Sequence, residues 1–370
     1  MRLRVGIVGC GGIAQMMHLP TLAERPDLFE ITALADVSRP TLEAVGRRYK
    51  VNALFSDHRE LVGRPDVDAV LLFASGSHKD AVTSALAAGK HVFVEKPLAF
   101  SLEEAEEVAA LAKQAKGRLM VGYHKRFDPH YLKARDAVRS MQDLRYVEAT
   151  VLHPDDAAYR THHVVLPLPE RPWAPMPEPE MNRRLLDIAA DTALDPRLDE
   201  TVGKDAPQAH RVGALLLFLS LIHDINALRG ILGEPERVIS AEVWQGGFAQ
   251  HSLTKFARDV RVSLSWISLP GIRHYEERLR FVSPEKRVTL RFPSPYLRHF
   301  PTPLEIETMD GDELVVEQRT VSYEEAFRAE LHYFHQCLLE GKPPQPSTED
   351  ALSDARWIRQ IARAYGKGNP

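Results

Sequence analysis

A glycine-rich turn near the N-terminus constrains the fold of this 370-residue chain more than any other feature. The apolar run Leu3 to Val8 is typical of a β-strand, and it leads directly into Gly9-Cys10-Gly11-Gly12-Ile13-Ala14, at the start of a helical segment. Gly9, Gly11 and Ala14 fit the G-x-G-x-x-[GA] spacing. The first glycine permits a tight turn, the second a close approach of backbone to a ligand, and Ala14 close packing of helix on strand. A pyrophosphate would lie at the N-terminus of that helix, where unpaired amides favour an anion.

Strands and helices alternate through the rest of the first 123 residues. We expect strands at Phe29–Ala35, Ala53–Phe55, Ala69–Ala74, His91–Val94 and Arg118–Tyr123, and helices at Thr41–Tyr49, His78–Ala88 and Ser101–Ala115. This alternation predicts an α/β fold for residues 1–123, a doubly wound parallel Rossmann sheet with helices on both faces.

Asp36 closes the second strand, 27 residues after Gly9. A carboxylate at this point accepts hydrogen bonds from the ribose hydroxyls of NAD and repels a 2′-phosphate. Arg39 lies three residues further on and could favour that phosphate instead. The sequence therefore predicts dinucleotide binding by residues 1–123, with NAD as the cofactor and NADP as the alternative.

The pattern changes after residue 123. Expected strands now alternate apolar and polar positions, as in Val260–Trp266, which is typical of an antiparallel sheet with one covered face. They lie at Arg145–His153, Glu236–Trp244, Val260–Ser268, His274–Val282, Arg287–Phe292, Leu304–Met309 and Glu313–Gln318, before helices at Tyr323–Leu339 and Thr348–Tyr365. Residues 124–370 are thus predicted to form a C-terminal α+β domain, with a large, mostly antiparallel open sheet, for substrate binding and oligomerisation.

A proline-rich insert at about 154–211 interrupts this domain. A segment of this length with little regular structure is usually functional or mobile. We expect either a lid that contacts the substrate, with His163 as a candidate contact, or a solvent-exposed loop. Trp244, Phe248, Trp266 and Ile267 on the alternating strands leave room for a partner sheet, so a homodimer or homotetramer is expected.

Charge and composition exclude several other classes. The 47 basic and 51 acidic residues give a net charge of -4 without a long block of one sign, so nucleic acid is not an expected partner. No signal-peptide pattern is present, and the longest apolar run, Ala214 to Ile222, is shorter than the ~18 residues of a membrane span and is typical of a buried helix. Cys10 and Cys337 have neither disulfide nor metal-site spacing. A cytoplasmic location without membrane partners is expected.

Three further stretches carry a resemblance to a known family. They are the run Ala88-Gly89-Lys90-His91-Val92-Phe93-Val94-Glu95-Lys96-Pro97-Leu98, the run Val121-Gly122-Tyr123-His124-Lys125-Arg126-Phe127-Asp128-Pro129, and the ending Glu330-Leu331-His332-Tyr333-Phe334 with the residues that follow it. Together with the glycine turn they resemble the glucose-fructose oxidoreductase, inositol dehydrogenase and MocA (Gfo/Idh/MocA) family. The resemblance extends almost from end to end, apart from the insert.

The resemblance implies an NAD(P)-dependent enzyme that oxidises or reduces a secondary alcohol or ketone of a sugar, inositol or glycoside. Lys96 would bind the substrate hydroxyl and tune its proton transfer, Glu95 and Pro97 would shape the turn beside the nicotinamide, and Arg126 would lie on the cofactor side. No metal is implied. The expected cofactor site also includes Gly12, Ile13, Ser75 and His78, and the expected substrate contacts include Tyr123, His124 and Asn226.

Members of this family also carry a helix with Asp-x-x-x-His, whose histidine is the general base. Here His223 matches the histidine, but Leu219 occupies the aspartate position. Ser220, or an acidic residue of the insert such as Asp155 or Asp156, could replace the missing carboxylate. Two alternatives stay open at this point: a cofactor-binding regulator or scaffold with impaired catalysis, or a dehydrogenase of a non-sugar diol.

Overall fold

The computed structural model describes residues 2–155, 157–167, 193 and 195–366. The chain forms two compact units. The first consists of Met1–Tyr123, Thr161–Ala174 and Phe327–Leu352, and the second of His124–Arg160, Pro175–Ala326 and Ser353–Pro370. Two later segments, 161–174 and 327–352, group with the first unit, although the sequence predicted residues 124–370 as one domain.

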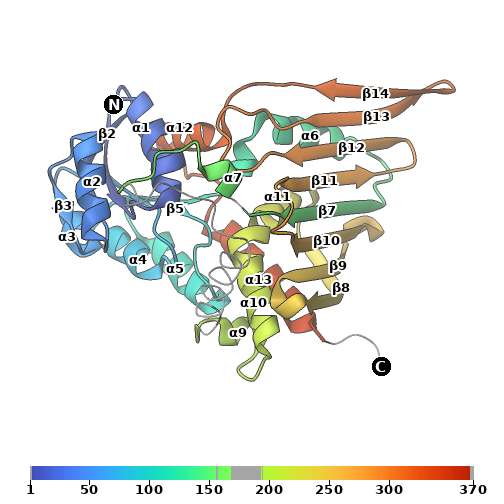
Figure 1. The fold of residues 1–370 in the computed structure, drawn as a ribbon, viewed down its shortest axis with the longest axis horizontal. Coiled ribbons are helices and arrows are strands. Elements are labelled where there is room, and N and C mark those ends of the chain that lie inside the picture. Colours follow the sequence, from blue (N-terminus) through green and yellow to red (C-terminus); the bar gives the residue numbers. More distant parts are fainter. Residues whose placement is uncertain (1, 156, 168–192, 194, 367–370) are drawn as a thin grey trace. The chain divides into compact units, whose positions relative to one another are not determined.

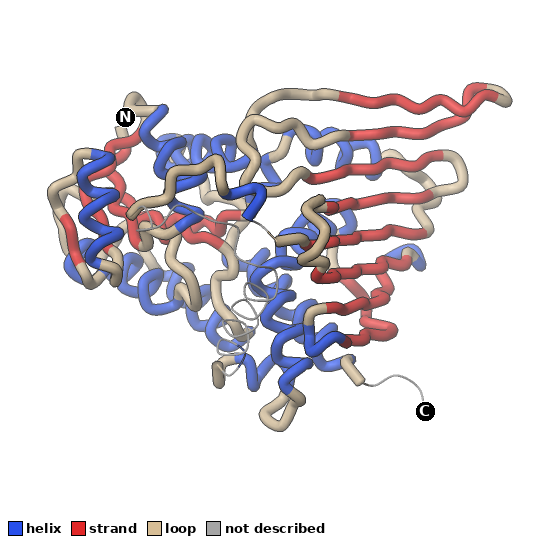
Figure 2. Tube along the Cα trace, in the orientation of Figure 1, coloured by secondary structure: helices blue, strands red, loops and turns tan. Residues whose placement is uncertain are grey.

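The first unit is built on a six-stranded parallel sheet, as predicted (Figures 1 and 2). Its strand order, β3-β2-β1-β4-β5-β6, places the strand that precedes the glycine turn in the middle. Among the central strands, β4 is buried along its whole length, and β1 and β5 are buried at all but one position each, as expected of a parallel sheet covered on both faces. The strands are β1 (Leu3–Val8), β2 (Phe29–Ala35), β3 (Leu54–Phe55), β4 (Ala69–Leu72), β5 (His91–Glu95) and β6 (Leu119–Gly122).

The helices of this unit begin where local sequence satisfies their first amides. The Ser38 hydroxyl accepts from the Thr41 amide at the start of α2, and the Ser101 hydroxyl accepts from the Glu104 amide at the start of α5. The helix after the glycine turn starts with a wide π-helical turn, η1 (Ala14–His18), and continues as α1 (Leu19–Glu24). The others are α2 (Arg39–Tyr49), α3 (His58–Val62), α4 (Lys79–Ala87) and α5 (Leu102–Gln114).

A helix from the end of the chain completes the core of the first unit. In α12 (Ala326–Leu339), Phe334 packs on Phe93 of β5 with ring centroids 5.7 Å apart, and His335 packs on Phe29 of β2 at 5.4 Å. Both contacts are edge-to-face, the geometry that aromatic pairs prefer. The helix was predicted at nearly these residues, but not its packing on the N-terminal sheet.

The second unit contains an eight-stranded sheet, whose strands lie side by side in Figure 1. Its order is β14-β13-β12-β11-β7-β10-β9-β8, and only the β7–β10 pair is parallel, which confirms the predicted mostly antiparallel sheet. The strands are β7 (Tyr146–His153), β8 (Pro235–Trp244), β9 (Ala249–Phe256), β10 (Arg261–Ser268), β11 (Glu276–Val282), β12 (Lys286–Phe292), β13 (Leu304–Asp310) and β14 (Glu313–Arg319).

Strand β9 was missed in the sequence because polar residues occupy its buried face. Gln250, Ser252 and Thr254 are at most 2% exposed, so no apolar alternation marks the strand. Protein groups satisfy two of them: the Gln250 amide donates to the Gly213 carbonyl, and the Thr254 hydroxyl accepts from the Trp357 indole. Buried polar groups persist where such partners exist.

Helices α6 and α10 contact the eight-stranded sheet, at β12 and β8 respectively. The helical elements of this unit are η2 (His124–Phe127), α6 (Pro129–Arg139), α7 (Ala157–Arg160), α9 (Leu198–Val202), α10 (Gln208–Leu216), η3 (Leu217–Leu221), α11 (Ile222–Leu232), η4 (Gln245–Gly247) and η5 (Ala257–Asp259); α13 (Thr348–Ala364) starts in the first unit and continues in the second. The helix Gln208–Leu232 is long and apolar enough to cross a membrane by composition, but 67% of its apolar window is buried, as in the core helix of a soluble protein.

Candidate functional site

The glycine turn uses its glycines for two different reasons. Gly9 has φ +89°, and a Cβ on it would lie 2.3 Å from the Ala74 amide nitrogen, so the fold itself requires glycine here. A Cβ on Gly11 would meet no atom of the described residues within 4 Å. Among these residues no neighbouring group therefore demands glycine at position 11, and the space beside it suits the approach of a phosphate to the backbone.

Asp36 organises the turn from the neighbouring strand. Its carboxylate accepts the Cys10 amide and the Ser38 amide, each at 2.7 Å. Each carboxylate oxygen keeps lone pairs for ribose hydroxyls, because a carboxylate offers about four acceptor sites. Arg39 is exposed and paired with Glu43 at 2.6 Å, so its guanidinium already has a carboxylate partner. Burial, and then the charge of Asp36, raise the pKa of the Cys10 thiol to about 12, which keeps it neutral.

Part of the predicted insert lies against the helix that follows the turn. The Gln15 side-chain amide donates to the Leu166 carbonyl at 2.8 Å and accepts from the Leu166 amide at 2.7 Å. Arg48 donates to the Val164 carbonyl at 3.1 Å. This segment thus contacts the cofactor half of the first unit, a contact that no sequence pattern indicated. His163, a predicted substrate contact, lies in this segment and packs against the neighbouring His162 with ring centroids 4.1 Å apart.

The loop that carries Lys96 is attached to the glycine turn through His78. The two His78 ring nitrogens face the Pro97 carbonyl at 2.7 Å and the Ala74 carbonyl at 2.8 Å, and Ala74 is the residue that closely approaches Gly9. Burial lowers the pKa of His78, although both carbonyls oppose this. His78, predicted as a cofactor contact, is thus buried between these two carbonyls, whereas Ser75, also predicted as a cofactor contact, is exposed.

Glu95 anchors Lys96 from the other side. Glu95 is 6% exposed; its Oε1 lies 2.6 Å from His18 Nε2, and its Oε2 accepts the Lys96 amide at 3.2 Å. Burial alone would raise the pKa of Glu95, but the hydrogen bond and charge of His18, together with Lys96, bring it below its ordinary value. An ionised carboxylate therefore holds the backbone at Lys96. Tyr123, predicted as a substrate contact, is 1% exposed at the end of this unit.

In the second unit, three consecutive residues of η2 pair with residues of α11. The rings of His124 and His223 lie 4.7 Å apart, edge to face. The next residue, Lys125, lies 3.3 Å from Asp224. After it, Arg126 Nε donates to the side-chain oxygen Oδ1 of Asn226 at 2.7 Å. The sequence-predicted residues His124, Arg126, His223 and Asn226 are thereby brought together where η2 meets α11.

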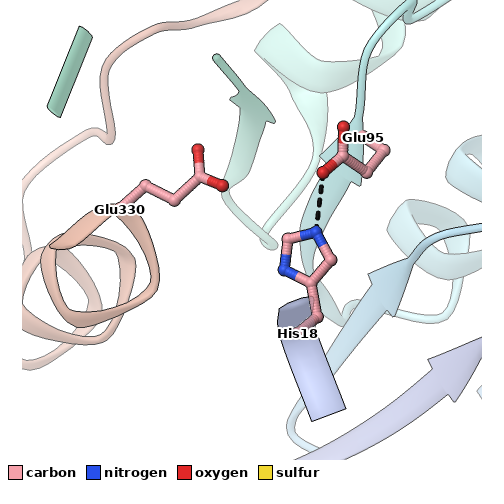
Figure 3. Close-up of side chains that lie close together, drawn as sticks. All are labelled: His18, Glu95 and Glu330. Carbon is pink, nitrogen blue, oxygen red and sulfur yellow. Dashed lines mark hydrogen bonds and ion pairs between the residues drawn. The ribbon is translucent and has the colours of Figure 1, made fainter. Parts of the chain in front are cut away.

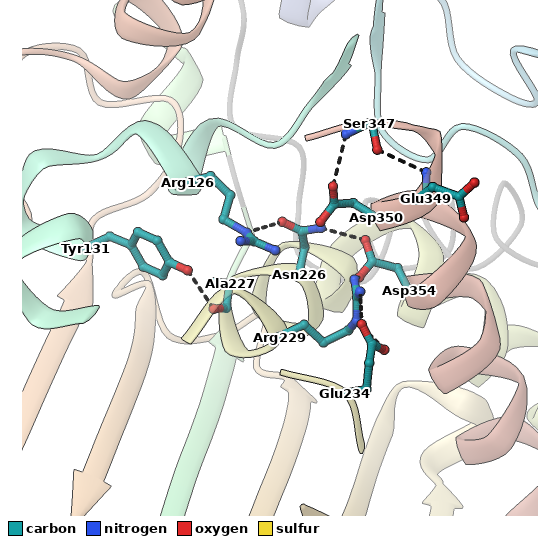
Figure 4. Close-up of polar contacts among 10 residues, drawn as sticks. All are labelled: Arg126, Tyr131, Asn226, Ala227, Arg229, Glu234, Ser347, Glu349, Asp350 and Asp354. Carbon is teal, nitrogen blue, oxygen red and sulfur yellow. Dashed lines mark hydrogen bonds and ion pairs between the residues drawn. The ribbon is translucent and has the colours of Figure 1, made fainter. Parts of the chain in front are cut away.

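Polar contacts on α11 fix the far end of this arrangement (Figure 4). The Asn226 amide nitrogen donates to Asp354 at 2.8 Å, and Arg229 bridges Asp354 at 2.6 Å and Glu234. The Tyr131 hydroxyl donates to the Ala227 carbonyl at 2.8 Å. Asn226 is fully buried with both ends of its amide bonded to protein groups, so its predicted substrate contact stays a prediction that this geometry does not favour.

Lys125 is the centre of a buried charge cluster that the sequence did not reveal. It pairs with Asp224 and Glu277, all three being at most 5% exposed, and its Nζ lies 4.6 Å from the centre of the Phe292 ring. Burial lowers the pKa of Lys125 and raises that of Asp224. The only signal was a glutamate, Glu277, at an inward position of an otherwise alternating strand. Because Asp224 serves Lys125, it is not a spare carboxylate for His223.

The turn before His223 is irregular where the family aspartate is replaced. Leu217–Leu221 forms a π-helical turn, a feature often found at functional sites, and Leu219 is 39% exposed. The Ser220 hydroxyl accepts from the Trp266 indole at 2.9 Å. The suggested substitute Ser220 is thus engaged, Asp155 is half-buried near the end of β7, and Asp156 lies outside the described residues. Lys96 belongs to the first unit and His223 to the second, so their joint action stays a prediction.

Comparison with known proteins finds a family model that residues 3–123 match. They match the model described as "Oxidoreductase family, NAD-binding Rossmann fold", GFO_IDH_MocA. Among curated relatives, an inositol 2-dehydrogenase of Agrobacterium fabrum is 38% identical over 141 residues, which is 37% of this chain and 42% of that protein. An uncharacterized oxidoreductase, YrbE of Bacillus subtilis, is 32% identical over 136 residues, 36% and 39% of the two chains. The chain thus matches about two fifths of the length of these relatives.

Solved structures match the whole fold. The 3-ketoreductase KijD10 from Actinomadura kijaniata, in complex with NADP and TDP-benzene, has a TM-score of 0.72 at 22% identity and covers 99% of this chain and 98% of its own. The aldose-aldose oxidoreductase from Caulobacter crescentus, complexed with glycerol, has a TM-score of 0.72 at 21% identity, with 98% and 97% covered. At these identities the likeness concerns the fold.

Proposed function

We propose that this chain, which belongs to the Gfo/Idh/MocA oxidoreductase family through residues 3–123, interconverts a secondary alcohol and a ketone on a sugar, inositol or glycoside with NAD(P). The observation that carries the proposal is the continuous connection from Gly9 through Ala74 and His78 to Pro97. It holds the cofactor turn and Lys96 together at the carboxyl end of the parallel strands, the place where open α/β sheets bind their ligands. The inositol 2-dehydrogenase relative supports the substrate class.

Within this function the side chains divide the work. The amides after Gly9 and Gly11 would hold the pyrophosphate, and Asp36 the adenosine ribose. When bound, the nicotinamide supplies the redox change. Lys96 would donate a hydrogen bond to the reacting oxygen and stabilise its developing charge, while His223 would take the hydroxyl proton in the oxidative direction.

The cofactor is expected to be NAD rather than NADP. The Asp36 carboxylate disfavours a 2′-phosphate, and the guanidinium of Arg39 is paired with Glu43. Asp36→Ala should weaken binding of NAD more than binding of NADP, measured by titration calorimetry with both cofactors. Because Asp36 also accepts the Cys10 amide of the glycine turn and the Ser38 amide, some loss for both cofactors is expected; a loss of equal size for both would refute the assignment.

The role of Lys96 can be tested by removing its amine. Lys96→Ala should lower kcat by at least ~100-fold, the scale of one lost proton-transfer or charge-stabilising group, while the dissociation constant of NAD changes little. Turnover is followed as reduced nicotinamide over a panel of inositols, pyranoses and glycosides. Lys113→Ala is the matched control, because Lys113 is an exposed lysine of α5 paired with Glu349. Near-normal kcat in Lys96→Ala would refute the role.

A second candidate is a cofactor-binding regulator or scaffold that has lost catalysis. The observation that favours it is Leu219, exposed at the position of the family aspartate. This candidate predicts NAD(P) binding without reduction across the whole panel, and one robust turnover removes it. Leu219→Asp separates the two further: in an active enzyme the added carboxylate, one turn from His223, should raise the pKa of that histidine and move the acid limb of the pH–rate profile to higher pH.

Assembly is proposed to occur through the sheet of the second unit, as a homodimer or homotetramer. Of the residues on which the sequence expectation rested, Trp266 is 4% exposed, whereas Trp244 is 38% exposed. The outer face of the sheet also carries ion pairs between neighbouring strands. They include Arg278–Glu148, Arg287–Glu307 and Arg291–Glu305. An oligomer held by such a charged face should dissociate as salt rises, which light scattering between low and high salt would show. A monomer at low salt would contradict the proposal.

A further inference from the structure

A buried cluster next to Lys96 is not used by the proposed function. It consists of His18 from η1, Glu95 from β5 and Glu330 from α12, all in the first unit (Figure 3). His18 and Glu330 are 0% exposed and Glu95 6%. One ligand atom from each residue lies within 4.8 Å of the others. Both Glu330 oxygens and His18 Nδ1 have no hydrogen-bond partner among the described residues.

The surroundings of the cluster are apolar. The His18 ring stacks on Phe73 with centroids 4.0 Å apart and an angle of 3°, and it meets Phe93 and Phe327 edge to face at 5.9 and 5.4 Å. The Glu95 and Glu330 carboxylates cannot both remain charged in such apolar surroundings without compensation, because like charges in a buried site repel strongly. The compensation must come from a cation or from protons.

The geometry favours protons. Two ligands of one tetrahedral zinc ion, each at about 2.0–2.1 Å from the metal, would lie about 3.3 Å apart. His18 Nε2 and Glu95 Oε1 lie only 2.6 Å apart, which is the distance of a charge-assisted hydrogen bond. Glu95 is the ionised member, as its lowered pKa indicates, so His18 Nε2 donates to it. Burial, and then the charge of Glu95, raise the pKa of Glu330 well above its ordinary value, so Glu330 is the protonated member.

We propose that His18 and Glu330 are positioning residues for Lys96, acting through the Glu95 carboxylate. His18 holds one oxygen of Glu95, the Lys96 amide occupies the other, and neutral Glu330 lets that charged carboxylate stay beside it. Ionisation of Glu330 would place two negative charges together and displace the Glu95 anchor. The other titratable groups that act on Glu95 are Lys96 and His78. This inference rests on the proposed function, because Lys96 is the residue that the cluster serves.

The first test measures the environment of Lys96 directly. An amine-acylating reagent labels the holoprotein, and mass spectrometry gives the rate at Lys96 in the wild type, in His18→Phe and in the control Glu340→Gln. Glu340 is an exposed glutamate that directly follows the end of α12. Phenylalanine keeps the stacking on Phe73 but cannot bind Glu95. His18→Phe should change the Lys96 rate severalfold and lower kcat at least tenfold with the cofactor KM little changed, while the control changes neither. A folded His18→Phe with wild-type labelling and kcat would overturn the proposal.

The second test uses pH and needs no turnover. Glu330 has a raised pKa when folded, so its contribution to stability is complete at low pH and is lost as pH rises through that folded pKa. The urea midpoint of the wild type should therefore fall on the alkaline side, and Glu330→Gln, which cannot ionise, should remove this fall. An identical alkaline fall in Glu330→Gln, or stoichiometric metal in the purified protein by elemental analysis, would overturn the proposal. If no substrate is turned over but labelling and stability behave as expected, the proposed function fails and the positioning of Lys96 stands.

Discussion

At the scale of single residues, the two glycines of the turn separate folding from binding. Gly11→Ala adds a methyl group into space that no atom of the described part of the chain approaches within 4 Å. Its free energy of unfolding should change by no more than ~0.5 kcal/mol, as for a surface substitution, while its dissociation constant for NAD rises at least tenfold because the methyl occupies the place of the phosphate. Urea unfolding and titration calorimetry measure the two quantities.

Two other glycine substitutions serve as comparisons for Gly11→Ala. Gly9→Ala must place a Cβ 2.3 Å from the Ala74 amide at a positive φ, so it should be destabilised as well as deficient in binding. Gly63→Ala, whose Cβ would make only ordinary contacts at 3.8 Å, is the control that should leave both quantities unchanged. If Gly11→Ala bound NAD like the wild type, the turn would not be the phosphate site.

Sequence motifs predicted those site residues whose chemistry depends on a motif. Gly9, Asp36 and Lys96 lie where the motifs suggested, on one side of the first unit. His18 and Glu330 were not found, because their significance comes from a contact between residues more than 300 positions apart, which no local pattern records. Lys125 was also missed, since a lysine beside an arginine gives no sign that its ammonium group will be buried.

At the scale of elements, the pairing of η2 with α11 positions His223. The buried ion pairs of Lys125 should contribute most of the stability of this pairing between η2 and α11. Lys125→Met leaves the Asp224 and Glu277 carboxylates together without a cation and should cost ~3–5 kcal/mol of unfolding free energy. Asp224→Asn leaves the Lys125–Glu277 pair intact and should cost clearly less. Urea unfolding of both variants measures the difference.

A larger loss of unfolding free energy in Lys125→Met than in Asp224→Asn would support the buried charge cluster. Equal costs for Lys125→Met and Asp224→Asn would mean that the three charges do not act as one cluster. Lys133→Met, on α6, is a control for the loss of a lysine from a neighbouring element, because Lys133 is exposed.

Element boundaries followed the sequence where hydrophobic periodicity was strong. Phe29–Ala35 was predicted to the residue, and α12 and α13 begin or end within three residues of expectation. Strand β9 failed because its inward face carries Gln250, Ser252 and Thr254, whose burial depends on partners supplied by other elements. The π-helical turn before His223 was also not predictable, since its residues have the periodicity of an ordinary buried helix.

At the scale of the whole molecule, the order of segments along the chain does not give the composition of the compact units. The first unit includes α12, from near the C-terminus, and part of the insert, from the middle of the chain. Phe334 and His335 pack on strands that precede them by more than 240 residues, and such a return is invisible to motif and periodicity. The fold class, by contrast, followed from the alternation of elements and the change to an antiparallel pattern after residue 123.

We propose that this chain oxidises a polyol or sugar carbinol with a nicotinamide cofactor. The most direct measurement incubates the protein and NAD with inositols and pyranoses deuterated at their ring carbons, and analyses the cofactor by mass spectrometry. We predict deuterium in the reduced nicotinamide for at least one substrate in the wild type, and its loss in Lys96→Ala. NAD that binds but never acquires deuterium from any of these substrates would contradict the account.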